Sequence, residues 1–243
     1  TGWRKPHPQT EHIGGAMTLA VLHCNNLVFK YASSGFELRI PEFSMQAGDT
    51  VFLEGNSGSG KSTLLNLMAG VLLPQSGHVS LMGQNLSALS ANRCDSLRVD
   101  HIGFLFQQFN LLSYLSVLDN VTLPCKFSKR RKQNAMAQAG TVRQAAERLL
   151  NGLGMGKYLD QPVSTLSVGQ QQRVAAARAL IGQPDLIIAD EPTSALDAGH
   201  QAQFVQLLLA QAAEQNTAVL LVSHDPNLAQ HCAKRQHMGQ WQA

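Results

Sequence analysis

A glycine-rich loop between a predicted strand and a predicted helix constrains this chain more than any other feature. The apolar residues 51–53 predict a strand that runs directly into Gly55-Asn56-Ser57-Gly58-Ser59-Gly60-Lys61-Ser62-Thr63. Beyond the loop, apolar residues recur at helical spacing as far as Val71. This pattern predicts a phosphate-binding loop, in which glycines let backbone N–H groups face phosphate oxygens. From average composition, its four fixed positions occur by chance in about one chain of this length in a hundred.

Charged side chains complete the predicted nucleotide site. Lys61 supplies a positive charge to the β- and γ-phosphates, and the Ser62 hydroxyl can ligate Mg²⁺. The apolar run 186–189 predicts a buried strand that ends in Asp190 and Glu191. We expect Asp190 to hold the hydrated Mg²⁺ and Glu191 to orient or deprotonate the attacking water. Together the two elements predict a P-loop nucleoside triphosphatase and nothing narrower.

A third motif resembles the signature of one family. The sequence Leu166-Ser167-Val168-Gly169-Gln170, followed by Gln171-Gln172-Arg173, is similar to the signature motif of ABC ATPases. The resemblance extends from about Leu19 to the C-terminus. It implies that ATP and Mg²⁺ are the cofactors and that two copies form a head-to-tail dimer. In such a dimer Ser167, Gly169 and Gln170 act in trans, because they complete the ATP site of the second copy.

Further positions match the motifs of this family. Gln107 matches the glutamine that reaches the metal and senses the membrane subunit, and residues 194–197 match the D-loop. His224 matches the histidine that contacts the γ-phosphate, which makes Glu191 and His224 the predicted catalytic residues. Tyr31 stands where the family has an aromatic side chain that stacks on adenine, and core packing is its alternative role. The predicted ATP contacts are Tyr31, Gly55, Asn56, Ser57, Gly58, Ser59, Gly60, Lys61, Ser62, Thr63, Gln107 and Asp190; the metal contacts are Ser62, Gln107 and, through water, Asp190.

Val168 departs from the family signature, which usually has glycine at this position. A β-branched residue would matter if the backbone there needed a positive φ or had to approach phosphate closely. The family makes its closest contacts through the residues that correspond to Ser167 and Gly169, and both are present. We therefore expect an active site, with Val168 affecting affinity at most.

The resemblance and the pattern along the chain predict one fold. It is an α/β P-loop NTPase (RecA-like) core with an antiparallel β subdomain and an inserted helical subdomain. We expect the core over residues 17–107 and 181–243 and the helical subdomain over 108–180. Residues 1–16 are predicted to be a disordered or artificial extension. Expected strands cover 21–22, 27–31, 36–40, 77–81, 186–189 and 218–222, with 121–123 as one further candidate, and expected helices include 141–150, 174–180 and 201–215.

Composition and charge exclude several classes of protein. A net charge of +3 does not indicate nucleic acid, and no apolar stretch approaches the ~18 residues that span a bilayer. The segment 1–16 is too polar for a signal peptide. Four cysteines without close pairing or metal-ligand spacing suit free thiols in a reducing compartment. One basic cluster, at positions 126 and 129–132, is either a solvated helix start or loop, or a contact for a partner or for anionic lipid.

The region around Gln107 narrows the resemblance to one branch of the family. Residues 101–112, together with 117–121 and Pro124, resemble ATPases paired with lipoprotein-releasing, macrolide-exporting and antimicrobial-peptide-resistance permeases. Glu is more usual than Asp119 there, and division-associated ATPases of the branch are similar. The resemblance implies a partner permease in the membrane, and a peripheral position on the cytoplasmic face of the inner membrane. It implies that ATP hydrolysis powers export or extraction of a lipoprotein, lipid, peptide or drug.

Two other classes of function are weighed against this one. ABC ATPases that act on nucleic acid or in translation usually carry long coiled-coil or zinc insertions, or two cassettes in one chain, and this sequence has one cassette. A scaffold with a degenerate site would lack Lys61, Asp190 or Glu191, and all three are present. The transporter ATPase is therefore the predicted function, and a regulator associated with cell division is the alternative.

Overall fold

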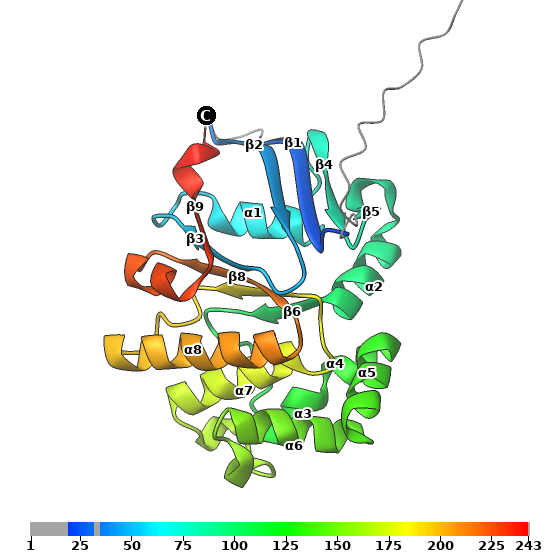
Figure 1. The fold of residues 1–243 in the computed structure, drawn as a ribbon, viewed down its shortest axis with the longest axis vertical. Helices are drawn as coiled ribbons and strands as arrows, with labels where there is room; N and C mark the ends of the chain where they lie inside the picture. Colours follow the sequence, from blue (N-terminus) through cyan, green and yellow to red (C-terminus); the bar gives the residue numbers. More distant parts are fainter. Residues whose placement is uncertain (1–18, 32–34, 243) are drawn as a thin grey trace, which may run out of the picture.

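Two β-sheets dominate the computed structural model, which describes residues 19–31 and 35–242 (Figure 1). The first sheet is antiparallel, with the order β2-β1-β4-β5. Its strands are β1 (Leu22–Lys30), β2 (Glu37–Met45), β4 (Ser76–Leu81) and β5 (Gln84–Asn85). The second sheet is parallel, with the order β6-β7-β8-β3-β9. Its strands are β3 (Thr50–Glu54), β6 (Ile102–Leu105), β7 (Leu186–Asp190), β8 (Ala218–Ser223) and β9 (Lys234–His237).

The parallel sheet is buried on both faces, which explains the continuously apolar sequence of its central strands. Leu186 and Ile188 pack into a core shared with helix α1 (Lys61–Met68) and the antiparallel sheet. Ile187 and Ala189 face the opposite way, into a core shared with α7 (Val168–Leu180) and α8 (Ala198–Glu214). Because side chains alternate along a strand, each face needs its own apolar residues.

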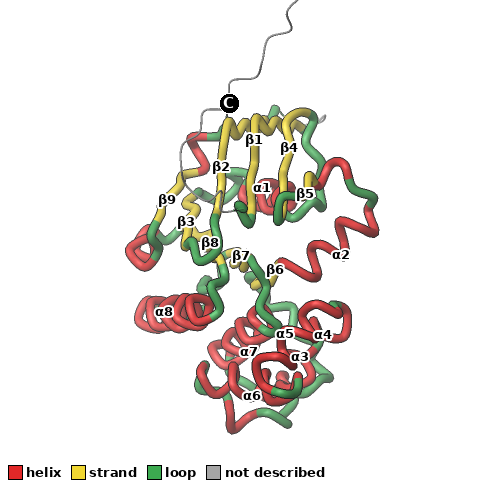
Figure 2. The backbone as a smooth tube through the Cα atoms, turned by 45° about the vertical axis from the view of Figure 1, so that its right-hand side comes forward, coloured by secondary structure: helices red, strands yellow, loops and turns green. Residues whose placement is uncertain are grey.

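The remaining helices confirm the predicted helical insertion. Helix α2 (Ala91–His101) leads into β6, and α3 to α7 lie on the side of the parallel sheet away from the antiparallel sheet (Figures 1 and 2). The bounds of the others are α3 Val117–Thr122, α4 Pro124–Phe127, α5 Lys129–Ala139 and α6 Val142–Gly152. Short 3₁₀ turns cover Leu86–Ala88, Gly156–Tyr158, Val163–Thr165, Pro226–His231 and Met238–Gln240. The predicted domain bounds, 17–107, 108–180 and 181–243, stay predictions, and residues 1–16 lie outside the described part.

Several predicted elements differ from the observed ones. The candidate strand 121–123 is wrong, because Val121 belongs to α3, where Ser116 caps the first turn and Val117 and Val121 are buried at helical spacing. The expected strands 21–22 and 27–31 form the single strand β1, which has a register shift where it pairs with β4. Helix α1 ends before Val71, whose side chain is exposed.

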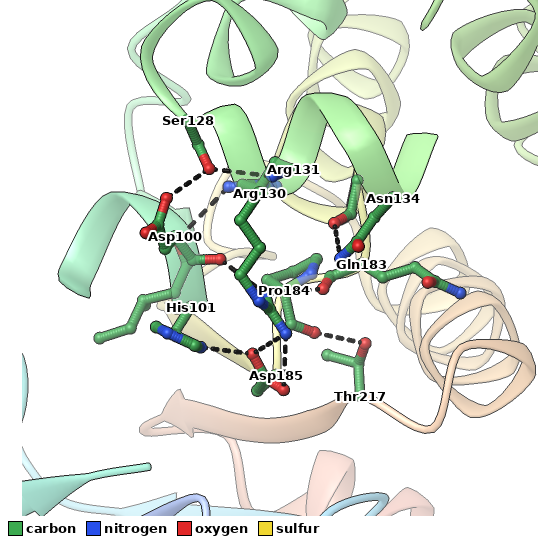
Figure 3. A network of polar contacts seen from close by, with 12 residues as sticks. Asp100, His101, Ser128, Arg130, Arg131, Asn134, Gln183, Pro184, Asp185 and Thr217 are labelled. Carbon is green, nitrogen blue, oxygen red and sulfur yellow. Dashed lines mark hydrogen bonds and ion pairs between the residues drawn. The ribbon is translucent and has the colours of Figure 1, made fainter. Parts of the chain in front are cut away.

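The basic cluster at 126 and 129–132 is only partly solvated, since two of its arginines tie α5 to the core (Figure 3). Arg131 is 3% exposed and donates to the carbonyls of Ala179 at 2.6 Å and Ile181 at 2.8 Å. Burial lowers the pKa of Arg131 to about 10, so it remains charged at neutral pH. Arg130 forms an ion pair with Asp185 at 2.9 Å, and His101 contacts the same carboxylate. The prediction of a solvated helix start is therefore wrong for Arg131.

The cysteines agree with the expectation of free thiols. All four cysteines fall within the described ranges and are free. Burial raises the pKa of Cys24 to about 12 and that of Cys232 to about 11, which keeps both thiols protonated. Within residues 19–31 and 35–242, the helices lack the length and apolar character that crossing a bilayer requires.

The contacts of Arg131 predict a large effect on stability. Arg131→Met should lower the free energy of unfolding by about 2–4 kcal/mol, because two buried carbonyls lose a charged donor. Urea denaturation measures the loss. Lys132→Met is the matched control, since the neighbouring side chain is exposed and should change stability by about 0.5 kcal/mol or less. Equal effects of the two substitutions would contradict the anchoring role of Arg131.

Candidate nucleotide site

The predicted site residues meet because they follow neighbouring strands of the parallel sheet. Gln107 follows β6, Asp190 and Glu191 lie at the end of β7, and His224 follows β8. The glycine-rich loop follows β3, the next strand in the sheet. Parallel strands place their carboxyl ends along one edge, where ligands of open α/β sheets bind.

A cleft of about 790 Å³ opens at this edge of the sheet. Its walls contain every predicted ATP contact except Gly55, together with both predicted catalytic residues and Phe36. The lining residues are Tyr31, Phe36, Asn56, Ser57, Gly58, Ser59, Gly60, Lys61, Ser62, Thr63, Gln107, Asp190, Glu191 and His224. Gly55 contributes its carbonyl oxygen instead, which accepts a hydrogen bond from Lys61 at 2.5 Å.

The loop needs glycine for two physical reasons. Gly58 has φ 77° and Gly60 has φ 85°, in the left-handed region that side chains disfavour. Gly60 is also the N-cap of α1, and a Cβ atom there would overlap the ring of Phe36. Phe36 was not predicted as a site residue, since it lies about 20 positions before the loop and belongs to no motif.

The charged groups of the cleft form one network. The Lys61 ammonium lies 3.2 Å from Glu191 Oε1 and donates to the carbonyls of Gly55 and Asn56. The other oxygen, Glu191 Oε2, accepts from the Ser223 hydroxyl at 3.2 Å and lies 2.9 Å from His224 Nδ1. Glu191 itself has φ 46°, a left-handed backbone that is uncommon outside glycine and is often found at functional sites.

Asp190 is the electrostatically strained member of the network. Burial raises the pKa of its carboxyl, and the neighbouring charge of Glu191 raises it further, while Lys61 acts in the opposite direction. The ionised carboxylate is therefore held in a place that disfavours its charge. A bound cation would remove this penalty.

Tyr31 lies at the aromatic end of the cleft. Its hydroxyl forms a hydrogen bond with Thr63 Oγ1 at 3.2 Å, and its ring stands edge-on to Phe29 with centroids 4.9 Å apart. Tyr31 as a whole residue is 41% exposed, and the centroid of the Phe36 ring lies 6.1 Å from that of Tyr31. Core packing therefore accounts for only part of the Tyr31 side chain, and its exposed part faces the cleft.

The signature residues lie apart from this cleft. The Ser167 side chain caps α7 by accepting a hydrogen bond from the Gln170 N–H. The Gln170 side chain in turn accepts from the Ser167 N–H at 2.9 Å and donates to the Tyr158 hydroxyl. Ser167 and Gly169 line a second cavity of about 440 Å³, and in the described chain the two cavities have no lining residue in common. Val168 is the first residue of α7, with its side chain about half exposed, so this departure from glycine causes no backbone strain.

Comparison with known proteins decides the family. Residues 38–194 match the family profile described as ABC transporter. The chain belongs to the ABC transporter family. It is 43% identical over 191 residues to the ABC transporter ATP-binding protein YbbA of Escherichia coli, which covers 79% of this chain and 81% of YbbA. It is 40% identical to the lipoprotein-releasing system ATP-binding protein LolD of Hydrogenovibrio crunogenus, covering 88% of this chain and 91% of LolD.

Further relatives extend the comparison. The chain is 41% identical to the macrolide export ATP-binding/permease protein MacB of Syntrophobacter fumaroxidans over 82% of its length, but spans only 27% of MacB. Among solved structures, a dimer of the ATP-binding cassette MJ0796 in a post-hydrolysis state with ADP and Pi has a TM-score of 0.75 and 33% identity. The match covers 89% of this chain and 93% of that cassette. These matches confirm the predicted family and fold class.

One arginine of this ABC cassette joins the Gln107 loop to the signature helix, and sequence reasoning missed it. Arg178, on α7, donates to the carbonyl of Phe109 at 2.5 Å and to that of Asn110 at 2.7 Å. Both acceptor residues have left-handed backbone, with φ 58° and 49°. Helix α7 therefore begins at the signature serine and ends at the loop that carries Gln107. The sequence gives no sign of this contact, because only the folded chain brings the arginine of the helix to the loop.

The raised pKa of Asp190 predicts how a substitution changes stability with pH. Below the unfolded-state pKa, both states hold the carboxyl protonated, so its burial costs nothing. As the pH rises through the folded-state pKa, the free-energy cost of burying the ionised carboxylate reaches its full value. Asp190→Asn should therefore raise the melting temperature of the nucleotide-free protein at pH 7, by about 2–4 °C for each kcal/mol relieved, and have little effect below about pH 4. A lower melting temperature at pH 7, recorded by calorimetry, would contradict this account.

Proposed function

We propose that this chain binds and hydrolyses ATP as the nucleotide-binding subunit of an ABC transporter, working as a head-to-tail dimer on a membrane permease. The observation that carries the proposal is the division of parts between two cavities. One cavity contains the glycine-rich loop, Asp190, Glu191 and His224, and the other contains Ser167 and Gly169 of the signature. A second copy turned head to tail can bring its signature cavity to the first copy's cleft.

The proposed nucleotide contacts follow from the chemistry of the cleft walls. Backbone N–H groups of the glycine-rich loop and the Lys61 ammonium suit phosphate oxygens, and the start of α1 adds partial positive charge. Tyr31 and Phe36 offer aromatic surface for the adenine at the other end. The cleft thus presents an apolar end and a cationic end, as a nucleoside triphosphate requires.

The same walls offer the donor types that Mg²⁺ prefers. Ser62, Gln107 and Asp190 all line the cleft and present a hydroxyl, an amide carbonyl and a carboxylate. Mg²⁺ takes hard oxygen ligands and keeps several waters, which agrees with a contact of Asp190 through water. The raised pKa of Asp190 fits a carboxylate that a cation compensates. When bound, the ion would neutralise charge on the phosphate oxygens.

Glu191 is the proposed general base. It would accept the proton of the water that attacks the γ-phosphate, and its bonds to Ser223 and His224 would hold the carboxylate in place. His224 turns Nδ1 toward Glu191, which leaves its other ring nitrogen for the γ-phosphate. Lys61 lies between this carboxylate and the loop, so a bound phosphate would share its charge.

The transport role is inferred from the named relatives. LolD and YbbA are ATP-binding proteins, and MacB carries ATP-binding and permease functions. By analogy this cassette would act on a permease, as a peripheral subunit on the cytoplasmic face of the inner membrane. The cargo would then be a lipoprotein, lipid, peptide or drug, whose contacts lie in the permease.

The assignment of Glu191 leads to the first test of this proposal. Glu191→Gln should lower ATP turnover by a factor of roughly 10²–10⁴ while ATP still binds, because the variant lacks the general base and keeps the glycine-rich loop unchanged. The trapped protein should elute as a dimer with ATP and as a monomer without it. Steady-state turnover and size-exclusion chromatography measure both. Hydrolysis close to the unsubstituted rate would place the base elsewhere.

The trans arrangement has a sharper test. Ser167→Arg places a bulky cation in the signature cavity, and Lys61→Ala removes the main phosphate contact, so each variant alone should be inactive. In a mixed dimer one site carries both lesions and the other carries none. Activity should therefore reappear in the mixture, at less than the unsubstituted level.

The control for this experiment is native mass spectrometry in the presence of ATP, which confirms that the heterodimer forms. If Ser167 served the nucleotide of its own chain, every site in the mixture would contain one lesion. Confirmed heterodimers without recovered activity would therefore contradict the head-to-tail dimer.

A further inference from the structure

The glycine-rich loop forms the wall between two cavities. Residues 56–59 line both the nucleotide cleft and a second cavity of about 280 Å³, which we call the rear cavity. The opposite wall of the rear cavity comes from the end of β9 and the segment after it, drawn in red in Figure 1. The lining residues on that wall are His237, Met238, Gly239 and Gln242. We call residues 237–242 the brace.

The brace is held at both of its ends. At the first end, β9 pairs with β3 in parallel, which sets His237 opposite Glu54, the last residue before the loop. At the other end, the Trp241 ring is buried edge-on to Phe43, with the ring centroids 5.6 Å apart. The Trp241 carbonyl also accepts a hydrogen bond from the Arg39 N–H at 2.7 Å. The brace therefore connects the parallel sheet to β2 of the antiparallel sheet and passes beside the loop.

The brace contacts the glycine-rich loop at two points. The buried Met238 side chain packs against Gly55 so closely that a Cβ atom on this glycine would lie 2.7 Å from Met238 Cγ. Near the other end of the loop, Gln242 Nε2 donates a hydrogen bond to the carbonyl oxygen of Ser59 at 2.7 Å. The second contact is directional, because it fixes one particular carbonyl of the loop.

The bond from Gln242 determines which way one peptide unit of the loop faces. The Ser59 carbonyl and the Gly60 N–H belong to the same planar trans peptide, so they point in opposite directions. Because Gln242 holds the carbonyl on the side of the rear cavity, the Gly60 N–H is turned to the side of the nucleotide cleft, which Gly60 lines. Glycine allows this peptide several orientations. The bond from Gln242 selects the one that suits a phosphate oxygen.

Lys61 cannot perform this task throughout the reaction. Its ammonium group donates to the carbonyls of Gly55 and Asn56, at the start of the loop, and a bound phosphate would share the same charge. Gln242 does not line the nucleotide cleft, so its bond to Ser59 competes with no ligand. This bond can therefore keep the end of the loop in place both before and after the nucleotide binds.

We propose that Gln242 is a positioning residue for nucleotide binding, which acts through the Ser59 carbonyl and keeps the Gly60 N–H directed at the phosphate groups. The proposal rests on the proposed function, since it describes how the same site is preorganised. Gln242 stands 183 positions from Ser59 and outside every motif of the sequence, so only the folded chain assigns it this role.

The test is calorimetric titration of the whole chain with ADP and Mg²⁺, which measures nucleotide affinity without hydrolysis. Gln242→Met keeps the length and the neutral charge of the side chain but removes the donor. The Kd for ADP should rise about fivefold, the factor that one ordinary hydrogen bond supplies, with unchanged stoichiometry. In steady-state assays the KM for ATP should rise while kcat stays the same. A lower stoichiometry with unchanged Kd would mean that Gln242 only stabilises the fold, and would overturn the proposal.

The matched control makes the same substitution elsewhere in the brace. Gln240 is exposed and does not line the rear cavity, so Gln240→Met should bind ADP like the unsubstituted chain. An equal rise in Kd in both variants would reduce the effect to a general disturbance of the brace and overturn the proposal.

Lys61→Ala separates this proposal from the proposed function. If Lys61→Ala loses ADP affinity and Gln242→Met does not, the proposed function stands and the role of Gln242 is wrong. If the unsubstituted chain binds no ADP, both proposals are overturned.

Discussion

The parallel sheet, buried on both faces, is the constraint on which the rest of the structure depends. Its central strands carry apolar side chains on both sides, so two separate cores hold them in register. Four neighbouring strands then end at the same edge, so the residues that follow them lie close together. Lys61, Gln107, Glu191 and His224 come from distant parts of the sequence and meet there without any direct sequence relation.

The site concentrates groups that do not favour the folded state by themselves. Asp190 is buried beside another carboxylate, Glu191 has a left-handed backbone, and Lys61 is largely enclosed between that carboxylate and two carbonyls. Each of these arrangements costs free energy that the two cores offset. Preorganised charges of this kind are typical of sites that stabilise charge during a reaction, since they need little rearrangement at the moment of reaction.

Much of this arrangement could be predicted from sequence, because short motifs encode local geometry. The loop Gly55–Thr63 requires glycine at its left-handed positions, and Asp190 ends a strand whose other residues are all apolar, so both are visible in the residues alone. Phe36 and Arg178 could not be predicted. Each acts on a residue far away in the sequence, the first on Gly60 and the second on the Phe109 carbonyl, and only tertiary packing brings these pairs together. The same holds for Arg131, which stands in a basic run that looks solvated until the buried carbonyls of 179 and 181 are placed beside it.

Helix α7 is held near its C-terminal end by two close contacts. Near its C-terminus, Arg131 binds the Ala179 carbonyl, and Gly103 of β6 packs so closely against the same residue that a Cβ atom would overlap it. Helix α7 has 13 residues and begins directly after Ser167, so its length is about 20 Å. A tilt of about 10° about the fixed end would carry the signature serine by about 3–4 Å, more than the tolerance of a hydrogen bond, while the Arg178 end scarcely moves. In the proposed dimer, a small rearrangement around Gln107 would therefore change how closely the signature serine approaches the second copy.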